Sequence, residues 1–189
     1  MKVISIKSAF VMLSVVILSA CASMGSGSVT EKRQVILDMQ QDALAKLYEK
    51  KPAARAEINA SPGYATFSNA NVNLLVLAAG TGYGVVNDNS SGKKTYMNMA
   101  EGGVGLGLGA KDYRIVMVFH NQSAMQQFIE NGWTFGGNAD AAAKASNKGK
   151  AIAGEAYYGD VSVYTMTESG LALQATVKGT KFWKDEQLN

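Results

Sequence analysis

The sequence predicts an α+β fold in which an antiparallel sheet carries an N-terminal amphipathic helix and two further short helices packed on one side. Apolar residues recur with helical spacing from about residue 30 to 50. From residue 64 onward, short stretches rich in β-forming residues alternate with turn residues. Four glycines stand at every second position between Gly103 and Gly109, which is the periodicity of a strand. Short connections favour antiparallel pairing, with strong curling of the sheet as one expected form.

The first 20 residues have the pattern of a bacterial lipoprotein signal peptide. Two lysines precede the apolar run Ala9–Leu18, which is too short to span a bilayer. Small residues then lead to Cys21, the single cysteine of the chain, whose thiol would receive a diacylglycerol. We therefore expect a signal peptide over residues 1–20, a covalent diacylglycerol and palmitate-type acyl anchor on Cys21, and a lipidated tether over residues 21–27.

The sorting residue predicts a location in the cell envelope, and the charge balance limits the expected partners. Ala22 follows the cysteine, where an aspartate would favour retention in the inner membrane, so we expect the outer membrane, facing the periplasm. Removing Lys2 and Lys7 leaves 16 basic against 15 acidic residues, and this near-neutral balance offers no global electrostatic case for binding nucleic acid. Six residues of tether extend about 20 Å, so the domain would stay close to its bilayer.

The first residues of the mature domain predict an amphipathic helix. Ser28 and Glu31 have the spacing of a capping box, and a buried face follows with Ile36, Met39, Ala43 and Leu47. The polar face carries both signs of charge, which favours packing on the domain over insertion into a membrane. A short second helix is expected over residues 53–59, between Pro52 and the turn at 61–63.

The rest of the chain is predicted to be strands joined by turns, with two short helices between them. Turns are expected at residues 87–92, 110–112 and 167–170. Asn121 or Ser123 can cap a helix with Met125, Phe128 and Ile129 on one face and Gly132 as its end, and Asn138 can cap a helix over 139–146. The expected strands are YATF, NLLVLAA, KKTYMNM, the glycine stretch, YRIVMVFH, VSVYTM and LALQATV.

The glycines do not match a nucleotide-binding loop. Gly92-Lys93 is followed by a second lysine where a P-loop needs serine or threonine, and neither GTGYG nor GVGLG opens a helix. In a strand, Gly103 to Gly109 would form one face that lets another element lie close to the backbone. A membrane-spanning barrel would need more ten-residue alternating segments than this chain has.

Catalytic and metal signals are weak throughout the sequence. Residues 87–98 follow the spacing of an EF-hand loop only in part, because the twelfth position is Asn98 and not glutamate. His120 is the single histidine, for which packing or hydrogen bonding at a strand end is expected. With the only thiol acylated, no cofactor or metal site is predicted and no enzyme activity is expected; an unrecognised hydrolase is the third and last hypothesis.

Two groups of residues are candidates for contact with lipid. The C-terminal segment combines basic and aromatic side chains, a mixture that suits the boundary between headgroups and acyl chains. The second group consists of basic residues expected at two turns. The alternative is that the aromatic residues close the core and the lysines form a solvated face. The first group is Lys178, Lys181, Phe182, Trp183 and Lys184; the second is Lys93, Lys94, Lys111 and Arg114.

The stretches SPGYATF, AAGTGYGVV, GGVGLGLGAKDYRIVMVF, FIENGWTFGGNADA and YTMTESGLALQATVKGTKFWKDEQLN together resemble the SYLF (Ysc84-type) domain. The resemblance covers residues from about 50 to the end, and it implies a single domain over residues 28–189. It also implies a lipid-binding module, with phosphoinositide binding and actin association in eukaryotic members and lipoproteins among bacterial ones. This chain has KKTYMNM where the family frequently carries a Trp-Ser-x-Pro motif.

Two functions follow as main hypotheses. The first is a non-enzymatic, membrane-anchored lipoprotein whose domain binds phospholipid or phosphoinositide-like lipid in maintenance of the cell envelope. The alternative is a structural or interaction lipoprotein that docks an envelope protein partner through its glycine-rich sheet.

Overall fold

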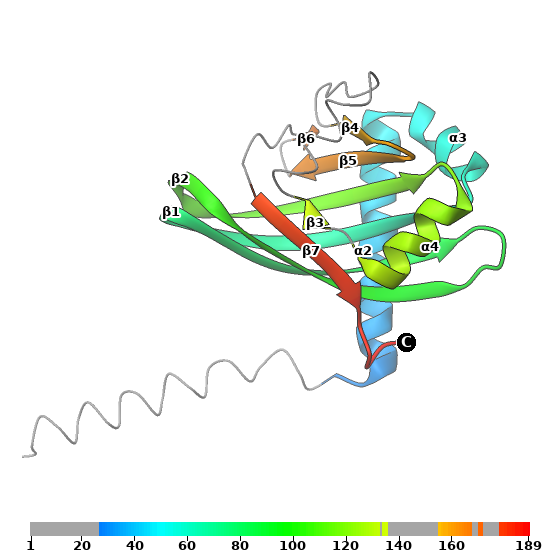
Figure 1. Ribbon diagram of the computed structural model, residues 1–189, viewed down its shortest axis with the longest axis horizontal. Helices are drawn as coiled ribbons and strands as arrows, with labels where there is room; N and C mark the ends of the chain where they lie inside the picture. The colour runs from blue at the N-terminus through cyan, green and yellow to red at the C-terminus, as the bar shows by residue number, and fades with distance from the viewer. Residues whose placement is uncertain (1–26, 133, 136–154, 168–169, 172–177) are drawn as a thin grey trace, which may run out of the picture.

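The computed structural model describes residues 27–132, 134–135, 155–167, 170–171 and 178–189. These residues form an α+β fold with three helices and an antiparallel sheet, as predicted (Figure 1). The predicted signal peptide, Cys21 and the helix expected over 139–146 lie outside the described residues. The elements are α2 (Val29–Lys50), α3 (Ala53–Ala60), α4 (Gln122–Asn131), β1 (Gly63–Asp88), β2 (Lys94–Phe119), β3 (Thr134–Phe135), β4 (Glu155–Tyr158), β5 (Val161–Thr167), β6 (Gly170–Leu171) and β7 (Lys178–Lys184).

The helices begin and end at the residues that the sequence indicates. The Ser28 hydroxyl accepts a hydrogen bond from the backbone N–H of Glu31 at 3.2 Å, and the Glu31 carboxylate accepts one from the Ser28 N–H at 2.6 Å. Asn121 caps α4 by accepting from Ala124 N–H at 2.8 Å. Gly132 ends α4 with a φ of 64°, in the left-handed region that favours glycine.

Two 26-residue strands, β1 and β2, form the centre of the sheet. They pair along their whole lengths, and five of the expected strands merge into these two. The turn predicted at residues 110–112 is wrong, because Ala110, Lys111 and Asp112 pair with Val72, Asn71 and Ala70 inside the ladder. The turn predicted at 87–92 is confirmed, and β5 pairs with β6 across the predicted turn at 167–170.

The β1–β2 pair changes direction halfway along (Figure 1). A straight strand from Gly63 to Asn87 would span roughly 80 Å. Instead, a Cβ added at Gly63 would lie 2.4 Å from the carbonyl oxygen of Asn87, so the two halves of β1 lie against each other. Glycine makes this contact possible: a Cβ would lie 2.1 Å from Ser68 O at position 82 and 2.2 Å from Thr66 O at position 84.

The glycine stretch of β2 coincides with this change of direction. Leu75 pairs with Gly107 and Leu77 pairs with Val104, so β2 has one residue more than β1 at this point. Such a bulge bends the strand and interrupts the alternation of its faces. The single unbroken glycine face predicted over residues 103–109 is therefore corrected. Away from the bend the sheet is not strongly curled (Figure 1).

Helices cover both faces of the sheet, whereas the sequence had predicted one. Along β2, Ile115, Met117 and Phe119 belong to one hydrophobic cluster, while Val116 and Val118 belong to another. Both faces are apolar, so each requires a cover. Helices α2 and α3 pack on the second cluster, and α4 packs on the first with Met125 and Phe128.

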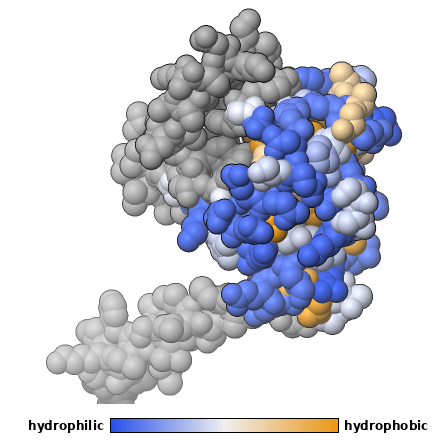
Figure 2. All heavy atoms as spheres, turned by 45° about the vertical axis from the view of Figure 1, so that its right-hand side comes forward, coloured by the Kyte–Doolittle hydropathy of each residue, from blue (hydrophilic) through white to orange (hydrophobic). Residues whose placement is uncertain are grey.

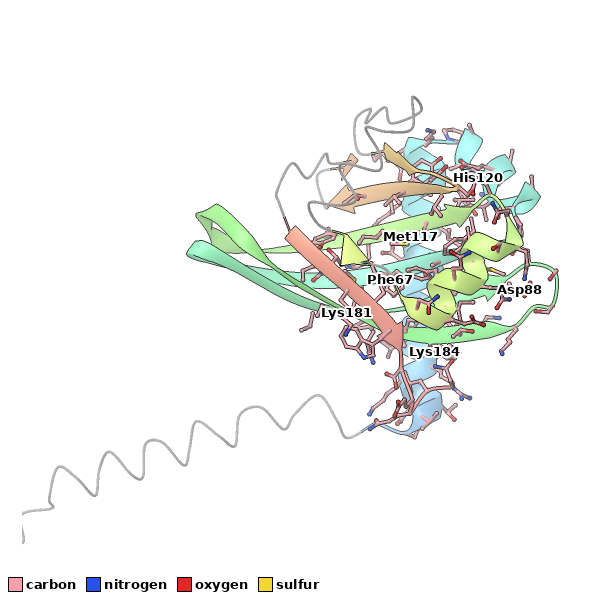
Figure 3. The ribbon with its side chains drawn as sticks, viewed as in Figure 1. Phe67, Asp88, Met117, His120, Lys181 and Lys184 are labelled. Carbon is pink, nitrogen blue, oxygen red and sulfur yellow. The ribbon has the colours of Figure 1, made fainter. Side chains whose placement is uncertain are left out.

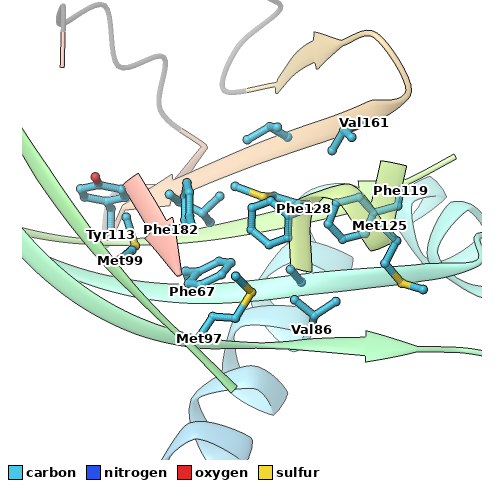
Figure 4. Packing of buried hydrophobic residues seen from close by; sticks show 14 residues of the cluster. Phe67, Val86, Met97, Met99, Tyr113, Phe119, Met125, Phe128, Val161 and Phe182 are labelled. Carbon is cyan, nitrogen blue, oxygen red and sulfur yellow. The ribbon is translucent and has the colours of Figure 1, made fainter. Parts of the chain in front are cut away.

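Phenylalanines from four elements hold the first cluster together (Figure 4). The ring of Phe182 on β7 lies 4.7 Å from that of Phe67 and 5.3 Å from that of Phe128, measured between centroids. Phe119 lies 5.3 Å from Phe128. These tilted and edge-on contacts fix β7 and α4 against the long strands, and thereby fix the side chains at the end of β7.

Candidate basic pocket

A pocket of about 500 Å³ lies at the end of the molecule where β2 begins and β7 ends. Its walls come from α2, the 88–93 turn, the start of β2, α4 and residues 184–189. Four of the lining side chains are cationic: Arg33, Lys93, Lys94 and Lys184. The pocket thus brings together Lys184 of the predicted C-terminal group with Lys93 and Lys94 of the predicted turn group.

Strand pairing brings Lys184 to the start of β2. Lys184 stands opposite Met97 in the β2–β7 ladder, three residues from Lys94. The next residues of the chain, 185–189, then fold over the start of β2. Asn189 holds them there, because its side chain accepts from Tyr96 N–H at 2.9 Å and donates to Tyr96 O at 2.8 Å.

The turn that carries Lys93 is held rigidly. The Asp88 carboxylate accepts hydrogen bonds from the Ser90 hydroxyl at 2.6 Å and from the N–H groups of Ser90 and Ser91 at 2.8 and 3.1 Å. The Ser90 hydroxyl is the main cause of the low pKa of Asp88, about 2. The Asn89 side chain donates to the carbonyls of Ile58 and Ser61 and so fixes the turn to the end of α3.

Arg33 reaches the pocket from the first turns of α2. Its Nε donates to the carbonyl oxygen of Leu188 at 3.0 Å, and its guanidinium carbon lies 5.4 Å from the centre of the Tyr96 ring. The Nε bond uses one of five guanidinium donors, which leaves the others for a ligand. Sequence reasoning missed Arg33, because nothing along the helix distinguishes it from the other surface charges of α2.

None of the described residues that line the pocket is acidic, and Asp185, which follows Lys184, bonds to neutral groups. The carboxylate of Asp185 accepts from the N–H groups of Gln187 and Leu188 at 2.9 and 3.2 Å, and from the Asn98 amide at 3.1 Å. Within the part of the chain that the structure describes, no ion pair joins a carboxylate to Lys93, Lys94 or Lys184. The pocket therefore has an excess of positive charge.

The other predicted lipid-contact residues are distributed differently. Phe182 is 1% exposed and belongs to the core, so it cannot contact a surface ligand while the fold is intact. Lys181 and Trp183 are exposed on β7, three residues and one residue before Lys184. Figure 3 labels Lys181 and Lys184. Arg114 is half-buried beside β5 and is not part of the pocket. Lys111 and Lys178 are described by their backbones alone, within β2 and β7.

His120 makes the strand-end hydrogen bond that the sequence predicts, away from the pocket (Figure 3). Its Nε2 lies 2.8 Å from Ser162 Oγ and 3.7 Å from Glu57 Oε1. The Tyr164 hydroxyl donates to the other oxygen of Glu57. A Ser-His-acid triad needs the serine and the carboxylate on different ring nitrogens and an accessible serine. Here both approach Nε2 and Ser162 is fully buried, so this cluster is not a hydrolase triad.

Comparison with known proteins shows similarity to a protein family and to a curated relative. Residues 100–189 match the Ysc84 family. Its description is "Las17-binding protein actin regulator". The Ysc84 match covers most of β2, α4 and β7, and it therefore includes Lys184 and the 185–189 wall of the pocket but not Arg33 or the lysines of the turn. The SYLF resemblance seen in the sequence is supported over these residues.

The relative is "Beta cell expansion factor A" from Aeromonas veronii. It is 32% identical over 158 residues, which are 84% of this chain and 59% of the relative. The chain thus spans about three fifths of the length of that protein. Among the described helices, none is long and apolar enough to cross a membrane. The described residues contain no group of three acidic, histidine or cysteine side chains that could hold a metal.

Proposed function

We propose that this protein is a non-enzymatic lipoprotein whose SYLF-type domain binds the anionic headgroup of a membrane phospholipid in the basic pocket. In this proposal, Cys21 carries a diacylglycerol and acyl anchor in the outer membrane, facing the periplasm, and the domain serves maintenance of the cell envelope. The observation that carries the proposal is the convergence of four cationic side chains on one pocket, with no carboxylate among the described residues paired to them.

The chemistry of the pocket suits a phosphate group. A guanidinium and several ammonium groups from separate elements provide charge-assisted donors to phosphate oxygens. Each lysine near an anionic surface contributes about 1 kcal/mol of attraction. Thr95 and Tyr96 add polar and aromatic surface to the same walls. The SYLF resemblance implies specificity for phosphoinositide-like lipids, and this specificity is part of the proposal. So is any preference of the pocket among anionic headgroups.

The position of the pocket also agrees with a lipid anchor. Arg33 lies on the second turn of α2, and the proposed tether immediately precedes this helix. A tether of six residues reaches about 20 Å. An anchored domain would therefore hold this end, with its cations, near the headgroups of its own bilayer.

The alternative, docking of a protein partner through the glycine-rich sheet, has less support. Gly82 and Gly84 contact the backbone of β1 itself, so this part of the glycine-rich surface is used inside the fold. We also propose that the protein has no enzyme activity. The geometry around His120, which is not that of a hydrolase triad, supports this part of the proposal. The names of the family and of the relative describe actin regulation and beta cell expansion for those proteins.

Co-sedimentation with vesicles tests the proposal. The chain from residue 22 onward is mixed with vesicles of phosphatidylglycerol and phosphatidylcholine. We expect Lys94→Gln/Lys184→Gln to weaken binding roughly 30-fold, from about 1 kcal/mol per lysine. The control, Lys46→Gln/Lys50→Gln, removes the same charge from exposed positions on α2, about 20 Å along the helix from Arg33.

The control should bind nearly as well as the original chain, because the two sites are farther apart than the Debye length of about 8 Å at physiological salt. Circular dichroism checks that each variant is folded. Equal binding by the folded pocket variant and the original chain would remove the pocket as the lipid site.

A further inference from the structure

The exposed large apolar side chains of the described residues include two that flank the basic pocket. Val29 is 43% exposed and Trp183 is 40% exposed. Val29 lies four residues before Arg33 and thus on the same face of α2. Trp183 immediately precedes Lys184 on β7.

Strand register places Trp183 on the same face of the sheet as α2. Trp183 stands opposite Asn98, which is two residues from Tyr96 and shares its face. Tyr96 in turn lies beneath the guanidinium of Arg33. Diagonal neighbours in an antiparallel pair are about 7–8 Å apart, so Trp183 lies close to the Tyr96 and Arg33 pair. Figure 1 shows the start of α2 and the end of β7 at the same lower end of the molecule.

We infer that Val29 and Trp183, with Arg33 between them and the lysines of the pocket beside them, form a docking face that inserts into the headgroup layer of an anionic bilayer. The inference rests on the proposed function and adds the orientation of the domain and its two apolar anchors. Tryptophan is enriched at the membrane interface, where its ring contacts both polar and apolar zones. Lysine and arginine beside it would meet the phosphates.

Two further observations favour a bilayer as the occupant. The positive excess of the pocket is complementary to anionic lipid. Twenty-six residues precede the described chain at the end where α2 begins, among them the predicted site of lipidation, Cys21. Figure 2 shows several small hydrophobic groups on a mainly hydrophilic face, one of them at this lower end. The exposed remainder of α2 carries both signs of charge, which suits water better than lipid.

Quenching of tryptophan fluorescence tests the docking face. The mature protein, purified from its host with Trp133→Phe so that Trp183 is its single tryptophan, is reconstituted into vesicles that contain phosphatidylglycerol and brominated phospholipid. We expect a blue shift and strong quenching of Trp183, and at least a several-fold loss of quenching in Lys94→Gln/Lys184→Gln or with neutral lipid. If Trp133→Phe does not fold, the difference between the original protein and Trp183→Phe gives the same signal.

Valine substitutions provide a matched pair. Val29→Ser should reduce the quenching of Trp183 several-fold, because it removes the second anchor. Val35→Ser changes a valine that is 55% exposed but lies on another face of α2, and it should leave quenching unchanged. Equal effects of the two substitutions would overturn the role of Val29.

The two proposals fail in distinguishable ways. An unquenched Trp183, with co-sedimentation still weakened by the pocket substitutions, would overturn the docking face and leave the lipid site intact. Full quenching in neutral vesicles would overturn the contribution of the cations to docking. A stable dimer in solution that shields Trp183 without vesicles would assign this face to a second copy of the chain, and would equally overturn the inference.

Discussion

Replacing Gly84 by alanine tests whether the two halves of β1 depend on glycine for their close contact. An added Cβ would lie 2.2 Å from the carbonyl oxygen of Thr66 and 2.3 Å from Cδ1 of Phe67. The oxygen is a backbone atom, so no change of rotamer can relieve the first contact. Phe67 is fully buried and its ring packs against Phe128 and Phe182, so the second contact would disturb the aromatic cluster.

The expected loss of stability follows from these distances. Overpacking of a core costs about 1–3 kcal/mol, and a backbone clash belongs at the upper end. Alanine recovers about 0.4–1 kcal/mol by reducing the entropy of the unfolded chain. The free energy of unfolding should therefore fall by about 2 kcal/mol, equivalent to a decrease in Tm of roughly 4–8 °C for a chain of this size.

Gly102→Ala is the control for this substitution. Gly102 lies in β2, and its Cβ would meet no atom within 4 Å. Its thermal midpoint, measured by circular dichroism, should equal or slightly exceed that of the original chain. Unchanged stability of Gly84→Ala, or an equal loss in Gly102→Ala, would refute the argument that close backbone approach determines the glycine.

Two other predictions concern Cys21 and Asp88. Cys21→Ala should abolish labelling with palmitate and leave an uncleaved or mis-sorted precursor; continued labelling would contradict lipidation at this residue. Because the pKa of Asp88 is lowered to about 2, its ionised form stabilises the folded chain above the ordinary pKa of 3.8, and this stability is lost as the pH falls toward 2. An NMR titration should give a midpoint near pH 2 for the Asp88 carboxylate and a higher one in Ser90→Ala; a midpoint near 4 in the original chain would contradict the hydrogen bonding of the turn.

Local signals determined the helices and one of the main turns. The capping box at Ser28, the apolar spacing of α2 and the cap at Asn121 act within one or two helical turns, so they can be read from neighbouring residues. The same applies to the turn at 87–92, where Asp88 and the serines bond to one another. The apolar run of YRIVMVF indicated a strand, but the packing of helices on both of its faces was not predicted.

Strand boundaries required the tertiary structure. The turn expected at 110–112 was wrong, because pairing with residues 70–72 continues the ladder through these residues. Glycine stretches could equally mark a flat face or a bend. Two features of the tertiary structure show that they mark a bend. One is the register between β1 and β2, with its bulge beside Gly107, and the other is the contact between Gly63 and Asn87.

The sequence by itself determined the fold class, the N-terminal helix and the basic character of the turn and of the C-terminal segment. Tertiary structure decided which of those charges act together. Lys94 and Lys184 are 90 residues apart in the chain and line the same pocket because β7 pairs with the start of β2, while Arg33 reaches this pocket from a helix on one face of the sheet. It also separated Phe182, which is in the core, from Trp183, which is exposed. Adjacent residues of a strand point to opposite faces, and which face is buried depends on the elements that pack against it.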